Sequence, residues 1–381
     1  MIKVCSKEFL KKFNQGIYSW SKIWSLFACL HYEVLQPNIQ QPLTNHYFVR
    51  SKKNLKAAKR FYSSTANDIS GSGAAYTQAC EPTKLSIHPW ALTGFIDGEG
   101  SFIISISKHN SNKVGWQVKL EFWLSLHKGD LAILESIQCF LGVGNIFKHP
   151  TKKIIHYRIT AIKDLAILLT HLDKYPLMTQ KRADYELFKS GYNLVLNKQH
   201  LIIDGLVKIV ALKASINLGL SDDLKAAFPN VTSEIRPIVE NKTIANLQWL
   251  AGFATAEGCF FIGIHKSSTI KIGVNVQLEF QITQHMRDEL LIKSLIRYLD
   301  CGNAHQNNNV FRYRVSRFSD LSEKIIPFFK KYPIFGLKYK DFLDFCIVIE
   351  LMKNKKHLCH EGVEEIRKIK AGTNSGRDKS N

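Results

Sequence analysis

The sequence contains no long apolar run and no paired cysteine motif. No apolar stretch among its 381 residues reaches the roughly 20 residues that a membrane-spanning helix needs. The eight cysteines include no CxxC pair and nothing at the N-terminus resembles a secretory signal, so we expect reduced thiols. His357, Cys359 and His360 lie close together, but no second ligand pair accompanies them to indicate zinc. These absences argue against a membrane-spanning protein and against a disulfide-built secreted domain.

Acidic residues are also scarce. The chain has 52 basic against 32 acidic residues, a formal net charge of +20. Such an excess favours a polyanionic partner, nucleic acid first and an anionic membrane surface second. A hydrophobic content of 45% and an aromatic content of 11% are enough for two domains of ordinary size, each with its own core. The composition therefore predicts a globular nucleic-acid-binding protein.

One acid-containing stretch occurs twice, as FIDGEGSF at 95–102 and FATAEGCF at 253–260. Glu99 and Glu257 each close an apolar segment rich in small residues, which predicts a buried helix that stops at glycine. A carboxylate at a helix C-terminus costs roughly 0.3–1 kcal/mol unless a cation neutralises it. An acid that simply faces solvent would explain one copy, but its repetition indicates a bound cation.

The two stretches belong to a long internal duplication. With the acids in register, His127 matches His285, and Asp130 matches Asp288, each pair offset by 158 positions. After a single-residue slip, KYPLMTQK (174–181) matches KYPIFGLK (331–338). An ordered series of matches over more than a hundred residues indicates two copies of one fold.

Each copy predicts the order α-β-β-α-β-β-α, an α+β fold with a four-stranded antiparallel sheet that has helices on one face. In the first copy, the strands are expected at 101–109, 114–127, 145–149 and 155–160, with a helix at 130–142. The predicted divisions of the chain are a basic leader (1–84), the first repeat (85–218), a linker (219–246), the second repeat (247–376) and a tail (377–381).

The face of each sheet that the helices leave uncovered is expected to be basic. Lysine and arginine on such a surface neutralise phosphates, while glutamine and arginine read base edges. An ordinary solvated sheet face is the alternative, but basic residues greatly outnumber acidic ones here. We predict double-stranded DNA contacts for Lys108, Gln117, Lys119, Lys148, Lys152, Lys153, His156, Arg158, Lys266, Lys271, Gln277, Arg312, Arg314 and Arg317.

The segments LTGFIDGEG (92–100) and LAGFATAEG (250–258) resemble the paired signature of the LAGLIDADG homing endonucleases, in their single-chain, two-repeat form. The resemblance covers about residues 85–376 and extends to LHKGD, GVGNI and KYPLMTQK. It implies two signature helices packed side by side at a pseudo-dyad, with two sheets forming a DNA-binding saddle. The small residues that would permit this close approach are Gly94, Gly98, Gly252 and Ala256.

The resemblance implies a monomeric endonuclease that hydrolyses one phosphodiester per strand at a long, non-palindromic DNA target and promotes intron mobility. By analogy, Glu99 and Glu257 bind divalent ions, Mg²⁺ as expected cofactor, helped by the backbone carbonyls of Gly98 and Ala256.

The family pattern also implies catalytic lysines and a polar residue near the reacting water, which match Lys181, Lys338 and Gln284. Leu126 stands opposite Gln284, so the half-sites are expected to differ. Asp97 corresponds to Thr255, a departure from which we expect little effect because the implied metal ligand is the later acid.

Residues 1–85 lie outside the duplication and contain 12 basic and 4 acidic residues. Arg60-Phe61-Tyr62-Ser63 resembles a matrix-peptidase site in a mitochondrial leader, whereas read-through from upstream of an intron would explain the segment equally. Both explanations predict a mitochondrial location. Two other functions stay open. One is an RNA maturase that binds intron RNA, which the loss of Glu99 or Glu257 would have favoured, and the other is a non-catalytic DNA-binding protein.

Overall fold

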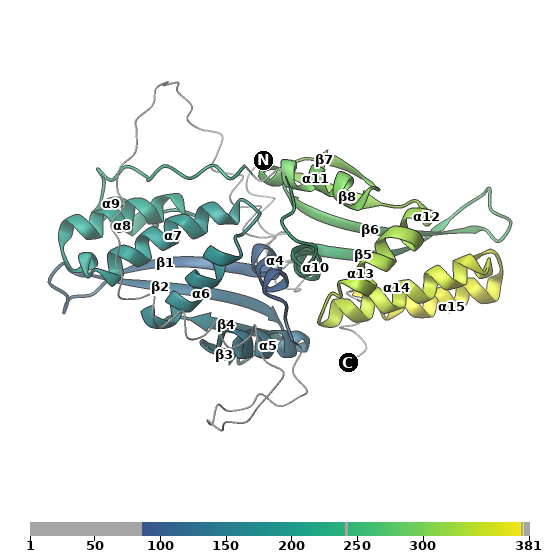
Figure 1. The fold of residues 1–381 in the computed structure, drawn as a ribbon, viewed down its shortest axis with the longest axis horizontal. Helices are drawn as coiled ribbons and strands as arrows, with labels where there is room; N and C mark the ends of the chain where they lie inside the picture. The colour runs from purple at the N-terminus through teal and green to yellow at the C-terminus, as the bar shows by residue number, and fades with distance from the viewer. Residues whose placement is uncertain (1–85, 241–242, 375, 377–381) are drawn as a thin grey trace, which may run out of the picture.

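A computed structural model describes residues 86–240, 243–374 and 376. The segment that resembles a peptidase site, residues 60–63, lies outside these ranges. Within them, no helix is both long enough and apolar enough to cross a membrane. The described residues fold into two similar halves whose sheets flank a central pair of helices, α4 and α10 (Figure 1).

The first half has the predicted element order. Its elements are α4 (Pro89–Glu99), β1 (Gly100–Lys108), β2 (Trp116–His127), α5 (Leu131–Leu141), β3 (Asn145–Lys148), β4 (Ile154–Ile159), α6 (Ile162–Lys174), α7 (Lys181–Leu196) and α8 (Ile203–Ser215). Its four strands form an antiparallel sheet in the order β1-β2-β4-β3. This confirms the sheet that the alternating apolar pattern predicts.

The second half repeats that arrangement. Its elements are α10 (Leu247–Glu257), β5 (Gly258–Lys266), β6 (Val274–His285), α11 (Glu289–Leu299), β7 (Asn303–Asn307), β8 (Val310–Val315), α12 (Phe318–Asp320), α13 (Ile326–Lys331), α14 (Leu337–Lys353) and α15 (His360–Ala371). The sheet order is β5-β6-β8-β7, again antiparallel. A π-helical turn, Leu321–Ile325, joins α12 to α13.

The segment predicted as a linker contains a short helix, α9 (Asp222–Ala227). Leu224 of this helix is buried, and the Phe228 ring lies 5.4 Å from that of Trp116. Further along, the Arg236 guanidinium pairs with the Asp184 carboxylate at 2.5 Å. The described part of the linker therefore packs along the first repeat.

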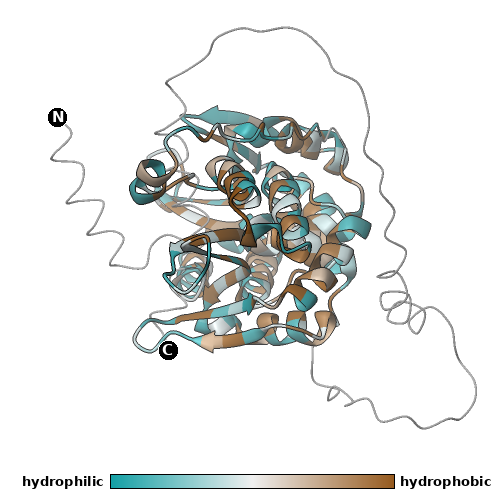
Figure 2. Ribbon diagram, turned by 90° about the vertical axis from the view of Figure 1, so that its left-hand side faces the viewer, coloured by the Kyte–Doolittle hydropathy of each residue, from teal (hydrophilic) through white to brown (hydrophobic). Residues whose placement is uncertain are grey.

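Each half has its own hydrophobic core between its sheet and helices. Apolar and hydrophilic residues alternate along the helices and strands, as expected of elements with one buried side (Figure 2). Among the cysteines of the described ranges, Cys259, Cys301, Cys346 and Cys359 are free. Cys139 is disulfide-bonded, so the expectation of reduced thiols is wrong for that residue.

Candidate functional site

The backbones of α4 and α10 approach one another closely at three small residues. A Cβ atom on Gly94 would lie 2.0 Å from the Trp249 carbonyl oxygen, and one on Gly252 would lie 1.8 Å from that of Ala91. A Cβ on Gly98 would lie 2.2 Å from the Cβ of Ala256. Because real Cβ atoms do not approach backbone so closely, only glycine permits this crossing. The close packing predicted for these residues is present.

The crossing brings the two acids toward one point. Glu99 and Glu257 are the last residues of α4 and α10, and both are half-buried. A Cβ on Gly98 would lie 3.3 Å from the Cγ of Glu257, which places the side chain of one acid beside the end of the other helix. The structure thus brings together two carboxylates that lie 158 positions apart in the sequence.

Each acid is followed by a glycine, but the glycine has a different role from the one we expected. Gly100 and Gly258 both have φ −70°, so neither is the left-handed cap that often ends a helix. A Cβ on Gly100 would instead meet the Ile96 carbonyl oxygen at 2.7 Å, and one on Gly258 would meet that of Ala254 at 2.5 Å. Glycine here lets the chain pass directly from the helix into β1 or β5.

The two lysines predicted from the family pattern lie at these helix ends. The Lys181 Nζ donates hydrogen bonds to the carbonyl oxygens of Ile96 at 3.1 Å and Gly98 at 2.9 Å. The Lys338 Nζ donates to the carbonyl oxygen of Ala256 at 2.8 Å. An ammonium group at a helix C-terminus neutralises the negative end of the helix dipole. Each lysine therefore supplies part of the positive charge that the terminal acids indicated.

Lys181 is half-buried and lies among acidic side chains. Burial lowers the pKa of the Lys181 ammonium, while the carboxylates of Asp97, Glu257 and Glu99 oppose that shift. All three acids consequently act on the same cation. Since a carbonyl oxygen has two lone pairs, Gly98 and Ala256 keep an acceptor site beyond the lysine bond.

Asp97 has a larger structural role than the sequence suggested. Its carboxylate accepts hydrogen bonds from the backbone N–H of Met178 (2.8 Å) and Thr179 (3.1 Å), from the Thr179 hydroxyl (2.6 Å) and from the Trp249 indole N–H (2.7 Å). Thr255, its counterpart, accepts one such bond, from the Phe335 N–H at 3.2 Å. Buried Asp97 thereby joins α4, α10 and the segment before Lys181. Its difference from Thr255 makes the two halves unequal.

The strand registers separate the predicted DNA contacts into groups. Residues that pair across an antiparallel sheet point to the same face. Residues paired with buried residues therefore face the helices, and the remaining residues form the open face. The open face carries Gln117, Lys119, His156, Arg158, Gln277, Arg312 and Arg314. Lys152, Lys153 and Lys271 lie in the connecting turns, and Arg317 follows β8. None of these side chains is buried.

Three predicted contacts instead lie toward the helix side of the sheets. Lys108 lies on the same face of β1 as buried Ile106, and Lys266 lies on the same face of β5 as buried Ile262. Lys148 pairs with buried Ile155. Alternation along a strand explains the difference, since one step moves a side chain to the other face. All three are exposed at strand ends, and DNA contact by them stays a prediction.

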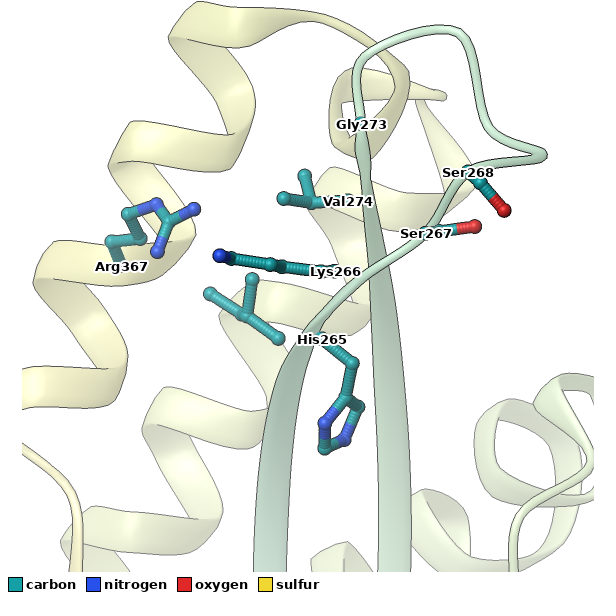
Figure 3. Close-up of a pocket in the computed structure, with 8 residues that line it drawn as sticks. His265, Lys266, Ser267, Ser268, Gly273, Val274 and Arg367 are labelled. Carbon is teal, nitrogen blue, oxygen red and sulfur yellow. The ribbon is translucent and has the colours of Figure 1, made fainter.

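Lys266 lines a pocket of about 650 Å³ beside the β5–β6 hairpin. Arg367 of α15 points into the same space, whereas His265 points away from both cations (Figure 3). Neither acid lines this pocket, so it is separate from the α4–α10 crossing. Gln284, the predicted polar residue, is half-buried at the penultimate position of β6, on the helix-facing side of its sheet. Its role stays a prediction.

The open faces of the two halves contain different ion and ring contacts, which the sequence did not predict. The Arg158 guanidinium lies 3.6 Å from the centre of the Trp123 ring, whose N–H bonds Glu121 at 3.0 Å. In the second half, Arg314 pairs with the Glu279 carboxylate at 2.5 Å. The period-two pattern does place these residues on one face, but it does not show which of them pair. The two arginines therefore present different surroundings to a bound molecule.

The described residues contain no group of three or more histidine, cysteine, aspartate or glutamate side chains that could hold a metal ion. This applies also to His357, Cys359 and His360. Glu99 and Glu257 with the carbonyls of Gly98 and Ala256 form a smaller, all-oxygen set. Such a set fits a hard divalent cation that completes its coordination with water or phosphate.

A family model described as LAGLIDADG endonuclease matches residues 92–192 and 250–349. Probable intron-encoded endonuclease 3 of Neurospora crassa is 41% identical over 288 residues, which cover 74% of this chain and 54% of that protein. An uncharacterized 50.9 kDa protein in ND4 intron 1 of Podospora anserina is 39% identical over 136 residues, which cover 35% of this chain and 29% of that protein. The chain thus spans about half the length, or less, of these relatives.

Solved structures resemble the whole described fold. The I-SmaMI LAGLIDADG homing endonuclease bound to cleaved DNA superposes with a TM-score of 0.75 and 46% identity, covering 77% of this chain and 98% of that one. The LAGLIDADG meganuclease I-CpaMI bound to uncleaved DNA gives a TM-score of 0.74 and 43% identity, covering 76% of this chain and all of that one.

Proposed function

This chain belongs to the LAGLIDADG endonuclease family, and from that membership we propose that it is a site-specific homing endonuclease that cuts both strands of a long DNA target. The observation that carries the proposal is the convergence of Glu99 and Glu257 at the α4–α10 crossing, between two basic sheets. The similar structures in complex with DNA support double-stranded DNA as the substrate. The unequal halves suit a non-palindromic target, and two repeats in one chain suit a monomer.

Divalent metal, with Mg²⁺ as the expected ion, would be held by Glu99 and Glu257 with the carbonyls of Gly98 and Ala256. When bound, such an ion activates water and stabilises charge that develops on the phosphate. The structure of I-SmaMI with uncleaved DNA and calcium ions supports a metal of this class. The lysine and glutamine side chains would not replace the metal but act beside it.

Lys181 and Lys338 would place a positive charge next to each scissile phosphate. Their hydrogen bonds to the carbonyls of Gly98 and Ala256 hold the ammonium groups at the ends of α4 and α10, which supports this role. A fixed cation stabilises the added charge of the transition state without reorganising. Gln284 would orient the attacking water in one half only.

The first test is cleavage of a randomised duplex library by the full-length chain. With Mg²⁺ we expect double-strand cutting at one long motif, and with EDTA we expect intact DNA that is still bound. Metal removal abolishes chemistry but leaves most phosphate contacts in place. Cutting that persists in EDTA would contradict the metal site. Failure to cut any duplex, with tight binding to a structured intron RNA, would favour the maturase alternative.

Base recognition should depend on Arg158, whose guanidinium is stacked on Trp123. We expect Arg158→Ala to lower discrimination at one target position by about 1–3 kcal/mol, the usual worth of an arginine contact to a base. Selection from the randomised library would show relaxed preference at that position alone. Arg297→Ala on α11 removes the same charge from the helix side and should leave the preference unchanged. Equal effects of the two variants would refute base contact by Arg158.

A mitochondrial setting is the proposed location. Its support is the leader-like composition of residues 1–85 and the similarity to proteins named for ND4 and cox1 introns. Such a chain would act on an intronless copy of its host gene. This part of the proposal is tested by locating the protein in fractionated cells, where recovery outside mitochondria would contradict it.

A further inference from the structure

The loops before α7 and α14 each extend one side chain across the boundary between the repeats. The segment before α7 sends Met178 into the core of the second repeat, and the matching segment before α14 sends Phe335 into the core of the first. The Phe335 ring lies 5.5 Å from that of Phe95 on α4. Each loop leads into a helix that carries one of the two lysines, here called a lysine helix. Helix α7 begins at Lys181, and α14 contains Lys338 in its first turn. Each loop therefore places one side chain in the core of the opposite repeat just before its lysine helix.

A carboxylate of the opposite repeat binds the start of each of these helices. The Asp288 Oδ1, in the turn between β6 and α11, accepts a hydrogen bond from the Gln180 N–H at 2.7 Å. The Asp130 Oδ1, in the turn between β2 and α5, accepts one from the Leu337 N–H at 2.7 Å. Gln180 and Leu337 are the residues that directly precede the two lysines. The duplication has placed the same contact twice, each time across the repeat boundary.

These two contacts supply what each helix start lacks. The first N–H groups of a helix have no partner within it, and a nearby carboxylate both accepts them and complements the helix dipole. The residues at the cap positions, Gln180 and Gly336, make no side-chain capping bond of their own. Asp288 is only 5% exposed, and burial raises the pKa of its carboxyl to about 6. A buried carboxyl with such a bond fixes the helix start more firmly than an exposed one.

The chain is shaped to admit the Asp130 contact. Gly336 has φ +71°, a conformation that favours glycine, and a Cβ there would lie 2.5 Å from the Asp130 Oδ1. A Cβ on Gly129, next to Asp130, would lie 2.7 Å from a methyl group of Leu337. The two segments therefore fit against each other closely at this one contact.

We propose that Asp130 and Asp288 are positioning residues that act across the repeat boundary, each fixing the lysine of the other repeat. The inference rests on the proposed function, in which each lysine serves one scissile phosphate. Asp288 would hold Lys181 at the end of α4, and Asp130 would hold Lys338 at the end of α10. Each half-site would then be completed by its neighbour, so that neither cuts until both repeats are docked.

We expect each aspartate variant to slow cleavage of the DNA strand that is served by the lysine of the other repeat. In a single-turnover assay on a duplex with both strands labelled, Lys181→Met and Lys338→Met first show which strand each lysine serves. Asp288→Ala should then slow the Lys181 strand, and Asp130→Ala the Lys338 strand. We expect ~10- to 100-fold, because a displacement of about 1 Å at a reacting group can cost ~10²-fold. Affinity for DNA should stay unchanged, because neither aspartate lies on the open sheet face.

Two further variants separate positioning from general support of the fold. Asp288→Asn and Asp130→Asn keep a carbonyl oxygen that accepts the same N–H, and should restore most of the lost rate. Ser294→Ala removes another buried hydrogen-bonding side chain, one that donates to the Leu291 carbonyl oxygen within α11 and touches neither lysine-bearing helix start. Any loss of stability that it causes should slow both strands equally. Asp130 is only half-buried, so Asp130→Ala carries the test even where Asp288→Ala fails to fold.

The outcomes are distinct. Equal slowing of both strands by Asp130→Ala and Asp288→Ala, or slowing of the strand that belongs to the same repeat, would overturn the inference while leaving the nuclease intact. Lysine variants without any effect on either strand would overturn it together with the proposed lysine role. Loss of cutting on metal removal is independent of all these variants and reports on the proposed function alone.

Discussion

Glu99→Gln is expected to slow cleavage by about 10³-fold or more on at least one strand, and to turn double-strand cutting into nicking. The carboxylate is one of two converging at the α4–α10 crossing, and its loss removes a proposed negative metal ligand. A metal that stabilises the transition state by roughly 4 kcal/mol accounts for that factor, since ~1.4 kcal/mol corresponds to tenfold in rate. Cleavage of a supercoiled plasmid that carries the target would show nicked circles in place of linear DNA.

Glu257→Gln should have the matching effect on the other strand, and the double variant should leave the plasmid supercoiled. Binding should be retained, because the acids lie at the ends of α4 and α10 and not on the sheet faces proposed to contact phosphates. Glu364→Gln at an exposed position of α15 removes the same charge away from the crossing and serves as the control. Full-rate linear product from either single variant would contradict the assignment of these acids as metal ligands.

Gly252→Ala is expected to lower the free energy of unfolding by about 3 kcal/mol, the upper end of the usual cost of overpacking. The new Cβ would lie 1.8 Å from the Ala91 carbonyl oxygen and 2.8 Å from the Ala91 Cα, so α4 and α10 must move apart. The intrinsic effect has the opposite sign, because alanine favours a helix interior over glycine by about 1 kcal/mol. A net loss in the free energy of unfolding therefore reports the steric clash between the new Cβ and Ala91. Urea denaturation followed by circular dichroism gives the value.

Gly372→Ala is the matched control, because a Cβ there would meet only the Ile369 carbonyl oxygen at 3.5 Å and Gly372 has φ −91°. It should leave stability unchanged or raise it by up to ~1 kcal/mol through the unfolded state. Separation of the helices should also weaken cleavage, since it draws the two acids apart. A Gly252→Ala protein as stable as its parent would show that the crossing tolerates a wider spacing.

Several features were available from the sequence because they depend on neighbours along the chain. Alternation of apolar residues predicted the strands, and the period of the duplication predicted two similar halves. The positions of Glu99 and Glu257 at helix ends followed from the glycines after them. Even here, glycine is needed at position 100 because a Cβ would clash with the Ile96 carbonyl, and not because the backbone is left-handed. The sequence does not distinguish these two reasons.

Other features required pairs of residues that are far apart in the chain. The difference between Asp97 and Thr255 was expected to have little effect, yet the Asp97 carboxylate accepts four hydrogen bonds, including one from Trp249. The pairing of Arg314 with Glu279, and the stacking of Arg158 on Trp123, likewise depend on which strands adjoin. Periodicity places a side chain on a face, but it does not identify its neighbour across the sheet.

By itself, the sequence determined that this protein is a duplicated α+β fold with one acid at the end of a helix in each copy. Local spacing was enough, because helix and strand periods and chain reversals are set within a few residues. Only the tertiary structure decided that the loops before Lys181 and Lys338 cross into opposite repeats, where Asp288 and Asp130 bind them. That exchange depends on close packing between segments more than a hundred residues apart, and each copy contains both halves of the contact.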